Sequence, residues 1–179
     1  MATRWEKLHQ REARLSHARL LELLDYDLET GIFTWKKKPA NRANRVKVGE
    51  PAGFSDGSEH IFVGIDGEKY YAHRLAWFYV KGVWPEEEID HKDTDGHNNR
   101  LNNLRECTHA QNMINRSSVN ETGYRGVYQQ KQCIVPRWCA GIVVDKKKIY
   151  LGSFETPEAA HAAYCSAAKK YHGEFARFA

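Results

Sequence analysis

The chain has 179 residues, of which 41% are hydrophobic and 12% aromatic. This provides a core for one ordinary domain or two small ones and excludes wholesale disorder. No run reaches about 18 apolar residues, which excludes a membrane-spanning helix, and the first residues lack the apolar segment of a secretory signal. The net charge of +4 is uneven: residues 1–112 carry 17 basic and 18 acidic side chains, whereas residues 113–179 carry 10 and 5. This basic second part and the six Lys and Arg at 36–47 indicate either a polyanionic partner or a merely solvated basic surface.

The N-terminal part predicts a helix followed by a short strand. Residues 5–24 place apolar side chains at helical spacing among charges, which predicts one amphipathic helix. The segment TGIFTWKKKP, residues 30–39, predicts a short strand that runs into a basic loop containing proline.

The next segment predicts a β-hairpin and a helix. The runs IFVGI (61–65) and KYYAH (69–73) flank Asp66 and Gly67, a pair that favours a tight hairpin turn. The second strand passes directly into a short apolar helix, and Gly82 is suited to end that helix.

A polar segment without an apolar pattern, residues 117–123, predicts a boundary between two domains. After it, Thr156 predicts a helix N-cap, Pro157 the first helical position and Gly173 the helix end. Small side chains on one face of this helix would let it lie close to a sheet: Ala159, Ala160, Ala163, Tyr164, Ala167, Ala168 and Tyr171. The sheet is predicted from three strand-like runs, at residues 123–130, 137–145 and 148–154.

Residues 89–112, IDHKDTDGHNNRLNNLRECTHAQN, are rich in Asp, Asn and His and are the candidate functional segment. Asp90 and His91 would lie at the tip of a strand, and a polar loop would lead to a return strand at 103–107. Thr108 can cap a helix that carries Asn112. This strand–loop–strand–helix order can bring Asp90 and His91 opposite Asn112.

Four interpretations of this segment compete. A calcium loop with Gly96 at its sixth position would have His91 at the first and Asn102 at the twelfth, where acidic ligands are required. A catalytic zinc site needs ligands at fixed helical spacing, which His91, His97 and His109 do not provide. The asparagines could simply tie a surface loop together. The fourth interpretation is phosphodiester hydrolysis, in which a carboxylate and an amide oxygen hold a divalent cation and a neutral histidine deprotonates water.

The Asp90-His91 pair, the NNRLNNL run of residues 98–104 and Gln111-Asn112 resemble the HNH endonuclease motif of phage and intron-encoded homing nucleases. Upstream segments are similar to the same family, so that the resemblance covers about residues 20–116. It implies that His91 is the general base, that Asn103 fixes the orientation of His91, and that Asp90 and Asn112 are metal ligands. The implied cofactor is one Mg²⁺ or Mn²⁺ ion per active site.

Several further residues near this motif are candidates with an open alternative. Arg74, Arg100 and Arg105 could grip neighbouring phosphates, or could be surface or structural arginines. We expect His73 to serve packing or to support the site from behind, and we expect His97 and His109 to lie on a loop and on a helix surface.

Residues 120–178 resemble the Apetala-type (ethylene-response-factor) DNA-binding domain, through YRGV, the strand with RW, YLGSF, TPEAA…AY and HGEFARF. In that family a three-stranded sheet lies in the major groove and a helix backs it. The resemblance implies a DNA-facing set of Arg125, Gln130, Arg137, Trp138, Lys147 and Tyr150. Tyr128 and Gln130 stand where the family has arginine, and QQKQCIVPRW inserts extra residues, so nonspecific or shape-based binding is expected there. A protein-interaction module is the alternative.

Together these features predict an α+β protein: an N-terminal HNH nuclease domain (1–116) with a ββα-metal motif, then a small three-stranded antiparallel sheet packed on one helix (117–179). The expected function is a metal-dependent DNA endonuclease, and the alternative is a DNA-binding regulator with an inactive nuclease-like domain. We expect a monomer that binds double-stranded DNA, with no membrane contact and no small-molecule cofactor. Four cysteines without a CxxC pair indicate reduced thiols in the cytoplasm, the host's if a phage encodes the chain: Cys107, Cys133, Cys139 and Cys165.

Overall fold

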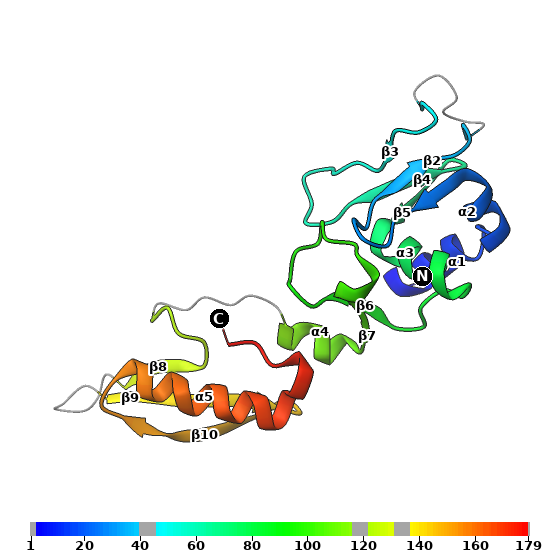
Figure 1. Cartoon of the computed structure of the whole chain (residues 1–179). Coiled ribbons are helices and arrows are strands. Elements are labelled where there is room, and N and C mark those ends of the chain that lie inside the picture. The colour runs from blue at the N-terminus through cyan, green and yellow to red at the C-terminus, as the bar shows by residue number, and fades with distance from the viewer. Residues whose placement is uncertain (1–2, 40–45, 116–121, 131–136, 179) are drawn as a thin grey trace. The chain divides into compact units, whose positions relative to one another are not determined.

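The computed structural model describes residues 3–39, 46–115, 122–130 and 137–178. It contains helices and small antiparallel sheets in two compact units, Met1–Thr108 and His109–Ala179 (Figure 1). Four parts of the chain that carried predictions lie partly or wholly outside the described residues: the boundary at 117–123, half of the basic segment at 36–47, the inserted residues before Arg137, and Cys133. No helix in the described ranges is long and apolar enough to cross a membrane.

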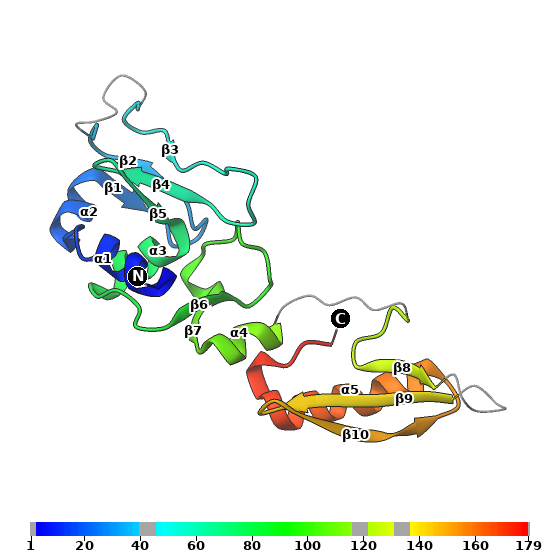
Figure 2. The same cartoon turned by 180° about the vertical axis from the view of Figure 1, so that it is seen from behind.

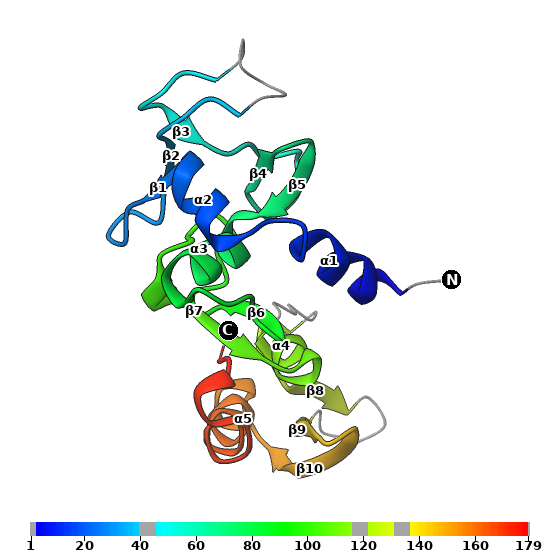
Figure 3. The same cartoon turned by 90° about the vertical axis from the view of Figure 1, so that its right-hand side faces the viewer.

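The N-terminal segment forms two helices where one was predicted, α1 (Arg4–Glu12) and α2 (His17–Leu23). Figure 3 shows them as separate helices that run in different directions. The break has a local cause, because Ser16 is extended and its side chain accepts a hydrogen bond from the backbone N–H of Arg19. A serine N-cap starts a new helix at this point. The apolar spacing continues across the break and therefore could not reveal it.

The chain then forms a three-stranded antiparallel sheet of β1 (Leu24–Tyr26), β2 (Phe33–Trp35) and β3 (Pro51–Ala52). The predicted strand after residue 30 is thus confirmed as β2. Its partner β1 begins at Leu24, a residue that was assigned to the helix. Residues of β1 alternate between buried and exposed positions, and those of β2 between buried and half-buried positions, as expected for a sheet with one face on the core.

The predicted hairpin is confirmed as β4 (Phe62–Ile65) and β5 (Glu68–Tyr71). Asp66 and Gly67 both have positive φ, +47° and +92°, which is the backbone geometry of a type I′ turn. The helix that follows, α3 (Ala72–Lys81), ends at Gly82 with φ +73°, as predicted. Its inner face joins the core of the first unit, whose most deeply buried members include Leu20, Leu23, Leu24, Phe33, Val63 and Leu75.

The polar segment contains the hairpin that carries the candidate residues. Strand β6 (Glu88–His91) pairs antiparallel with β7 (Leu104–Cys107), with Asp90 opposite Arg105. A short 3-10 helix, η2 (Leu101–Asn103), precedes β7. The predicted strand–loop–strand order is confirmed. The helix that follows in sequence, α4 (His109–Asn115), belongs to the second unit, so a complete ββα-metal unit stays a prediction.

The second unit contains the predicted sheet and helix. Strands β8 (Val127–Gln130), β9 (Arg137–Val144) and β10 (Lys147–Phe154) form an antiparallel sheet in the order β10-β9-β8. Helix α5 (Pro157–His172) lies along one face of this sheet (Figure 2), and the 3-10 helix η3 (Gly173–Phe175) follows. Thr156 caps α5 as predicted, since its side chain accepts a hydrogen bond from the backbone N–H of Ala159.

The inner face of α5 is narrower than predicted. Ala160, Tyr164, Ala167 and Ala168 are buried, whereas Ala159 and Tyr171 are exposed. A Cβ on Gly126 would lie 2.0 Å from the ring of Tyr164, so only glycine permits this close approach of the chain to the helix.

Candidate functional site

Asp90 and His91 end β6 and are both buried, with 6% and 5% of their surface exposed. The Asp90 carboxylate is paired across the hairpin with Arg105, whose Nη2 and Nε lie 2.7 and 2.9 Å from Oδ2. The register causes this contact, because the two residues are directly opposite each other in the antiparallel pair. Arg105 therefore holds the Asp90 carboxylate in place at the tip of β6, where its oxygens can serve as metal ligands.

The imidazole of His91 is held on one side by an amide. Its Nε2 lies 3.3 Å from Oδ1 of Asn99, and the amide nitrogen of Asn99 donates to the carbonyl of His97. The second bond orients Oδ1 toward His91. Because an amide oxygen can only accept, Nε2 carries the proton in neutral His91 and Nδ1 carries the lone pair.

Burial lowers the pKa of His91, while the bond to Asn99 and the nearby aspartates partly oppose this effect. Burial likewise lowers the pKa of His60, and it lowers that of His73 strongly, with the neighbouring imidazoles adding to both shifts. His91 is therefore neutral at physiological pH, which is the form that can accept a proton.

Asn103 ties the polar loop together. Its Nδ2 donates to Oδ1 of Asp93 and to the carbonyl of Asn98, both at 2.9 Å, and its Oδ1 accepts from the backbone N–H of Asp93 at 3.2 Å. The side chain of Asn99 forms the hydrogen bond to Nε2 of His91, and sequence reasoning missed this residue. The predicted action of Asn103 on His91 stays a prediction. Asn99 lies in a segment with several asparagines. The sequence did not show which of these asparagines contacts the histidine.

An N-terminal turn supports the loop at Asn99. The hydroxyl of Tyr26 donates to the carbonyl of Asn99 at 2.7 Å, and Arg100 Nε donates to the carbonyl of Glu29. Gly31 has φ +74°, and a Cβ there would lie 2.5 Å from the backbone nitrogen of Arg100. A glycine is thus required for the turn to reach the loop that positions Asn99.

The predicted phosphate contact of Arg74 is not supported by its position. The side chain is buried, and its Nε and Nη2 pair with the two carboxylate oxygens of Glu12 at 2.5 and 3.0 Å. It also donates to the carbonyls of Pro85 and Glu87. These bonds engage the guanidinium in the protein interior. They favour the alternative that Arg74 is a structural arginine. Arg100, by contrast, is exposed.

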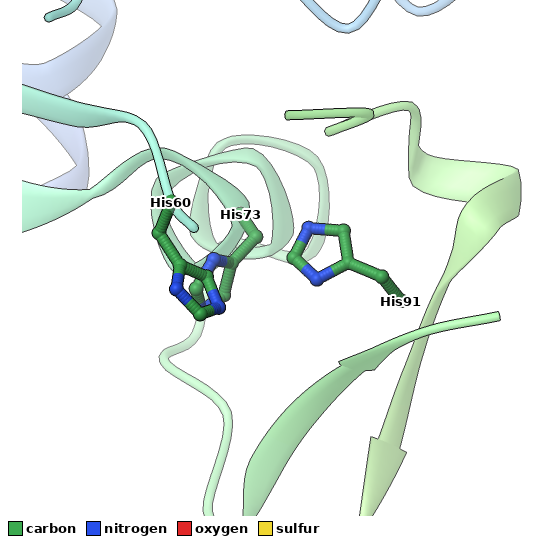
Figure 4. Close-up of side chains that lie close together, drawn as sticks. All are labelled: His60, His73 and His91. Carbon is green, nitrogen blue, oxygen red and sulfur yellow. The ribbon is translucent and has the colours of Figure 1, made fainter. Parts of the chain in front are cut away.

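Three histidines from separate elements gather behind the strand tip: His60 before β4, His73 on α3 and His91 on β6. Each offers one ring nitrogen, and these nitrogens all lie within 4.8 Å of one another (Figure 4). The Nδ1 atom of His73 is buried and has no hydrogen-bond partner among the described residues. The expectation that His73 is a packing residue is consistent with its burial, but sequence reasoning missed His60 altogether.

The predicted metal ligand Asn112 lies on α4 of the second unit and is half-buried. Its pairing with Asp90 stays a prediction. The carboxylate of Asp90 is the type of oxygen donor that Mg²⁺ prefers, and so suits the ion that we predicted.

The predicted DNA-facing residues of the second unit divide between two faces of the sheet. Residues paired across strands share a face, and the register pairs Gln130 with Arg137 and Gly141 with Tyr150. Gln130, Arg137 and Tyr150 therefore lie on the face away from α5.

The other two predicted residues on the strands, Trp138 and Lys147, lie on the opposite face, and their contact with DNA stays a prediction. Trp138 alternates to the face toward α5 and packs with Val127, Ala140 and Ala160. Lys147 follows the same alternation, and its neighbour Lys148 takes the outer face instead, with Nζ 4.3 Å from the ring centre of Tyr128.

Arg125 precedes the sheet. It is half-buried, and its Nη2 donates to the carbonyl of Ile114 at 2.6 Å.

Residues 70–114 match the family described as HNH endonuclease. The match includes α3 and the β6–β7 hairpin, and with them Asp90, His91, Asn99 and Asn103. It begins at residue 70, so it lies inside the chain and is shorter than the predicted domain at 1–116. No curated protein matches the chain. The match supports a nuclease of the HNH class, whose members act on DNA and generally use a divalent metal ion.

Proposed function

We propose that this chain is a metal-dependent DNA endonuclease in which His91 is the general base. The observation that carries the proposal is the arrangement of His91 within the HNH match: a buried, neutral imidazole held by Asn99 beside the Asp90 carboxylate. Phosphodiester hydrolysis needs an activated water and stabilisation of the charge that builds up on phosphorus oxygens. In this proposal His91 activates the water, and Asp90 helps to stabilise the charge.

The proposed role of His91 follows from its hydrogen bond. With Nε2–H donated to Asn99, Nδ1 accepts a proton from a water molecule as the water oxygen attacks phosphorus. The P–O bond to the leaving oxygen then breaks, and that oxygen takes up a proton from solvent. Because Asn99 holds the ring and is itself held by Tyr26, the base does not need to be ordered at the moment of reaction.

We further propose that Asp90 and Asn112 hold one Mg²⁺ or Mn²⁺ ion. A bound ion of this kind neutralises negative charge on the phosphate and stabilises the leaving oxygen. Arg105 keeps the Asp90 carboxylate in one orientation through bonds from Nη2 and Nε to Oδ2.

The second unit is proposed to direct the nuclease to DNA. Its outer sheet face carries Gln130, Arg137, Lys148 and Tyr150 around a net positive segment, and such a face suits phosphate contacts and groove binding. A tethered DNA-binding unit raises the local concentration of the nuclease at its substrate. In this proposal residues 1–116 cleave DNA and residues 117–179 bind it.

A plasmid-nicking assay tests the proposal. The full chain should nick supercoiled DNA with Mg²⁺ and should not do so with EDTA. The variant His91→Ala should lose cleavage and keep DNA binding, whereas His97→Ala, an exposed histidine on the same loop, should cut normally. Normal cutting by His91→Ala would show that another group is the base. DNA binding by the wild type without any cutting would favour a DNA-binding regulator.

A further inference from the structure

The three clustered histidines come from parts of the chain far apart in sequence. Their ring centres lie 5.0 Å apart for His73 and His91, 5.2 Å for His60 and His73, and 5.8 Å for His60 and His91. The loop after β6 is held against the segment of His60 by Gly96, where a Cβ would lie 1.8 Å from the carbonyl oxygen of Glu59. The fold therefore holds these imidazoles together by close backbone packing.

The spacing of the ring nitrogens is near that of a tetrahedral metal site. Zn–N bonds of about 2.0–2.1 Å place neighbouring ligand nitrogens about 3.4 Å apart. The nitrogens of the cluster are separated by no more than 4.8 Å. Each pair therefore needs to approach by at most about 1.4 Å to reach the tetrahedral spacing. The two rings of a pair can share this movement by rotating within their rotamer wells.

His73 provides an independent indication that a ligand is missing. Its Nδ1 is buried without a hydrogen-bond partner in the described part of the chain, and the residue is 6% exposed. A buried polar atom without a partner costs free energy. A metal ion bound at this Nδ1 would remove that cost, because a neutral imidazole nitrogen is a good ligand for zinc.

We propose that His60, His73 and His91 form a binding site for a transition-metal ion such as Zn²⁺, and that the bound ion stops cleavage by occupying His91. Three imidazoles suit Zn²⁺, Co²⁺ or Ni²⁺, whereas Mg²⁺ prefers oxygen ligands. The site is thus distinct in chemistry from the hard-cation position proposed at Asp90. Its inhibitory consequence depends on the proposed role of His91 as base, while the binding itself does not.

Spectroscopy with Co²⁺ as the probe tests the binding without any activity measurement. The full chain, freed of metal with EDTA and dialysed, should develop the intense visible bands of tetrahedral Co²⁺, and Zn²⁺ should displace them. His60→Ala removes a half-buried ligand that takes no part in the proposed catalysis, and should weaken Co²⁺ binding at least 10-fold. His97→Ala is the matched control and should bind normally. Absence of the bands in the wild type, bands unchanged in His60→Ala, or thiolate charge-transfer bands that indicate cysteine ligands would each overturn the site.

Nicking assays in Mg²⁺ then test the regulation. Micromolar Zn²⁺ should inhibit the wild type, whereas His60→Ala should cut at the wild-type rate without Zn²⁺ and resist its addition. Equal inhibition of both proteins would overturn the regulatory part of the proposal. If the wild type does not cut in Mg²⁺ at all, the proposed function fails, and the Co²⁺ spectrum still decides whether the histidines bind metal.

Discussion

Replacing Arg74 with Met should destabilise the first unit strongly. The guanidinium and the Glu12 carboxylate are each 3% exposed at the side chain and are joined by two bonds. Removing the arginine leaves a buried carboxylate without its partner, and breaking a buried pair in this way costs about 3–5 kcal/mol. This is a large share of the stability of a domain of ordinary size, which is about 5–15 kcal/mol.

A second variant separates the charge effect from the loss of packing. In the double variant Glu12→Leu, Arg74→Met, apolar side chains of similar size replace the pair, and such replacements are often neutral or stabilising by about 1–4 kcal/mol. We therefore expect the two single changes to be strongly non-additive, with the double variant more stable than Arg74→Met but below wild type, because the carbonyls of Pro85 and Glu87 still lose their donor. Urea unfolding followed by tryptophan fluorescence measures this, because four of the five tryptophans lie in the first unit: Trp5, Trp35, Trp77 and Trp84.

The same variants decide between a structural and a phosphate-binding role for Arg74. Under conditions where Arg74→Met is folded, its DNA affinity and the salt dependence of that affinity should equal those of the wild type. A variant with unchanged stability, or with a log–log salt slope reduced by about 0.9, the loss expected for one phosphate contact, would refute the structural interpretation.

Three further predictions concern the site, the histidines and the sheet. Asn99→Ala should lower the cleavage rate by about 10- to 100-fold with DNA affinity unchanged, because the His91 ring loses its positioning bond; unchanged single-turnover rates would exclude this role for Asn99. In EDTA, the free energy of unfolding of the first unit should be constant above about pH 6.5 and fall as the pH drops below it, since the clustered histidines have lowered pKa values when folded and take up protons more readily when unfolded. Urea midpoints measured across this range check the sign, and a midpoint that rises on acidification would contradict it. Lys148→Ala should weaken DNA binding and reduce the salt slope by about 0.9, whereas Lys147→Ala should have a smaller effect; the reverse order would show that the inner lysine faces DNA.

Elements with local signals were predicted well. The turn at Asp66-Gly67, the helix end at Gly82 and the cap at Thr156 all occur where the sequence indicated them, because turn and cap chemistry depends on a few adjacent residues. The prediction of a single helix over residues 5–24 was wrong because it relied on apolar periodicity and overlooked a local cap. The apolar spacing continued across Ser16, and the serine cap that starts α2 was a weaker signal than the periodicity.

The candidate site was only partly visible in the sequence. Asp90, His91 and Asn103 belong to one short sequence motif. They could therefore be assigned to the same site without knowledge of the fold. The contact between Asn99 and His91 depends on how the loop turns back on itself. That turn is supported by Tyr26 and Gly31, which lie about 70 residues earlier in the chain.

The sequence by itself therefore determined the class of fold, most of the strands and helices, and the short motif of the proposed nuclease site. Only the tertiary structure decided that Arg74 pairs with Glu12, that His60 joins His73 and His91, and that Lys148 rather than Lys147 shares a face with Tyr150. The physical reason is the same in each case. Turns and caps are set by neighbouring residues, whereas these contacts depend on strand register and on packing between segments that are distant in the chain.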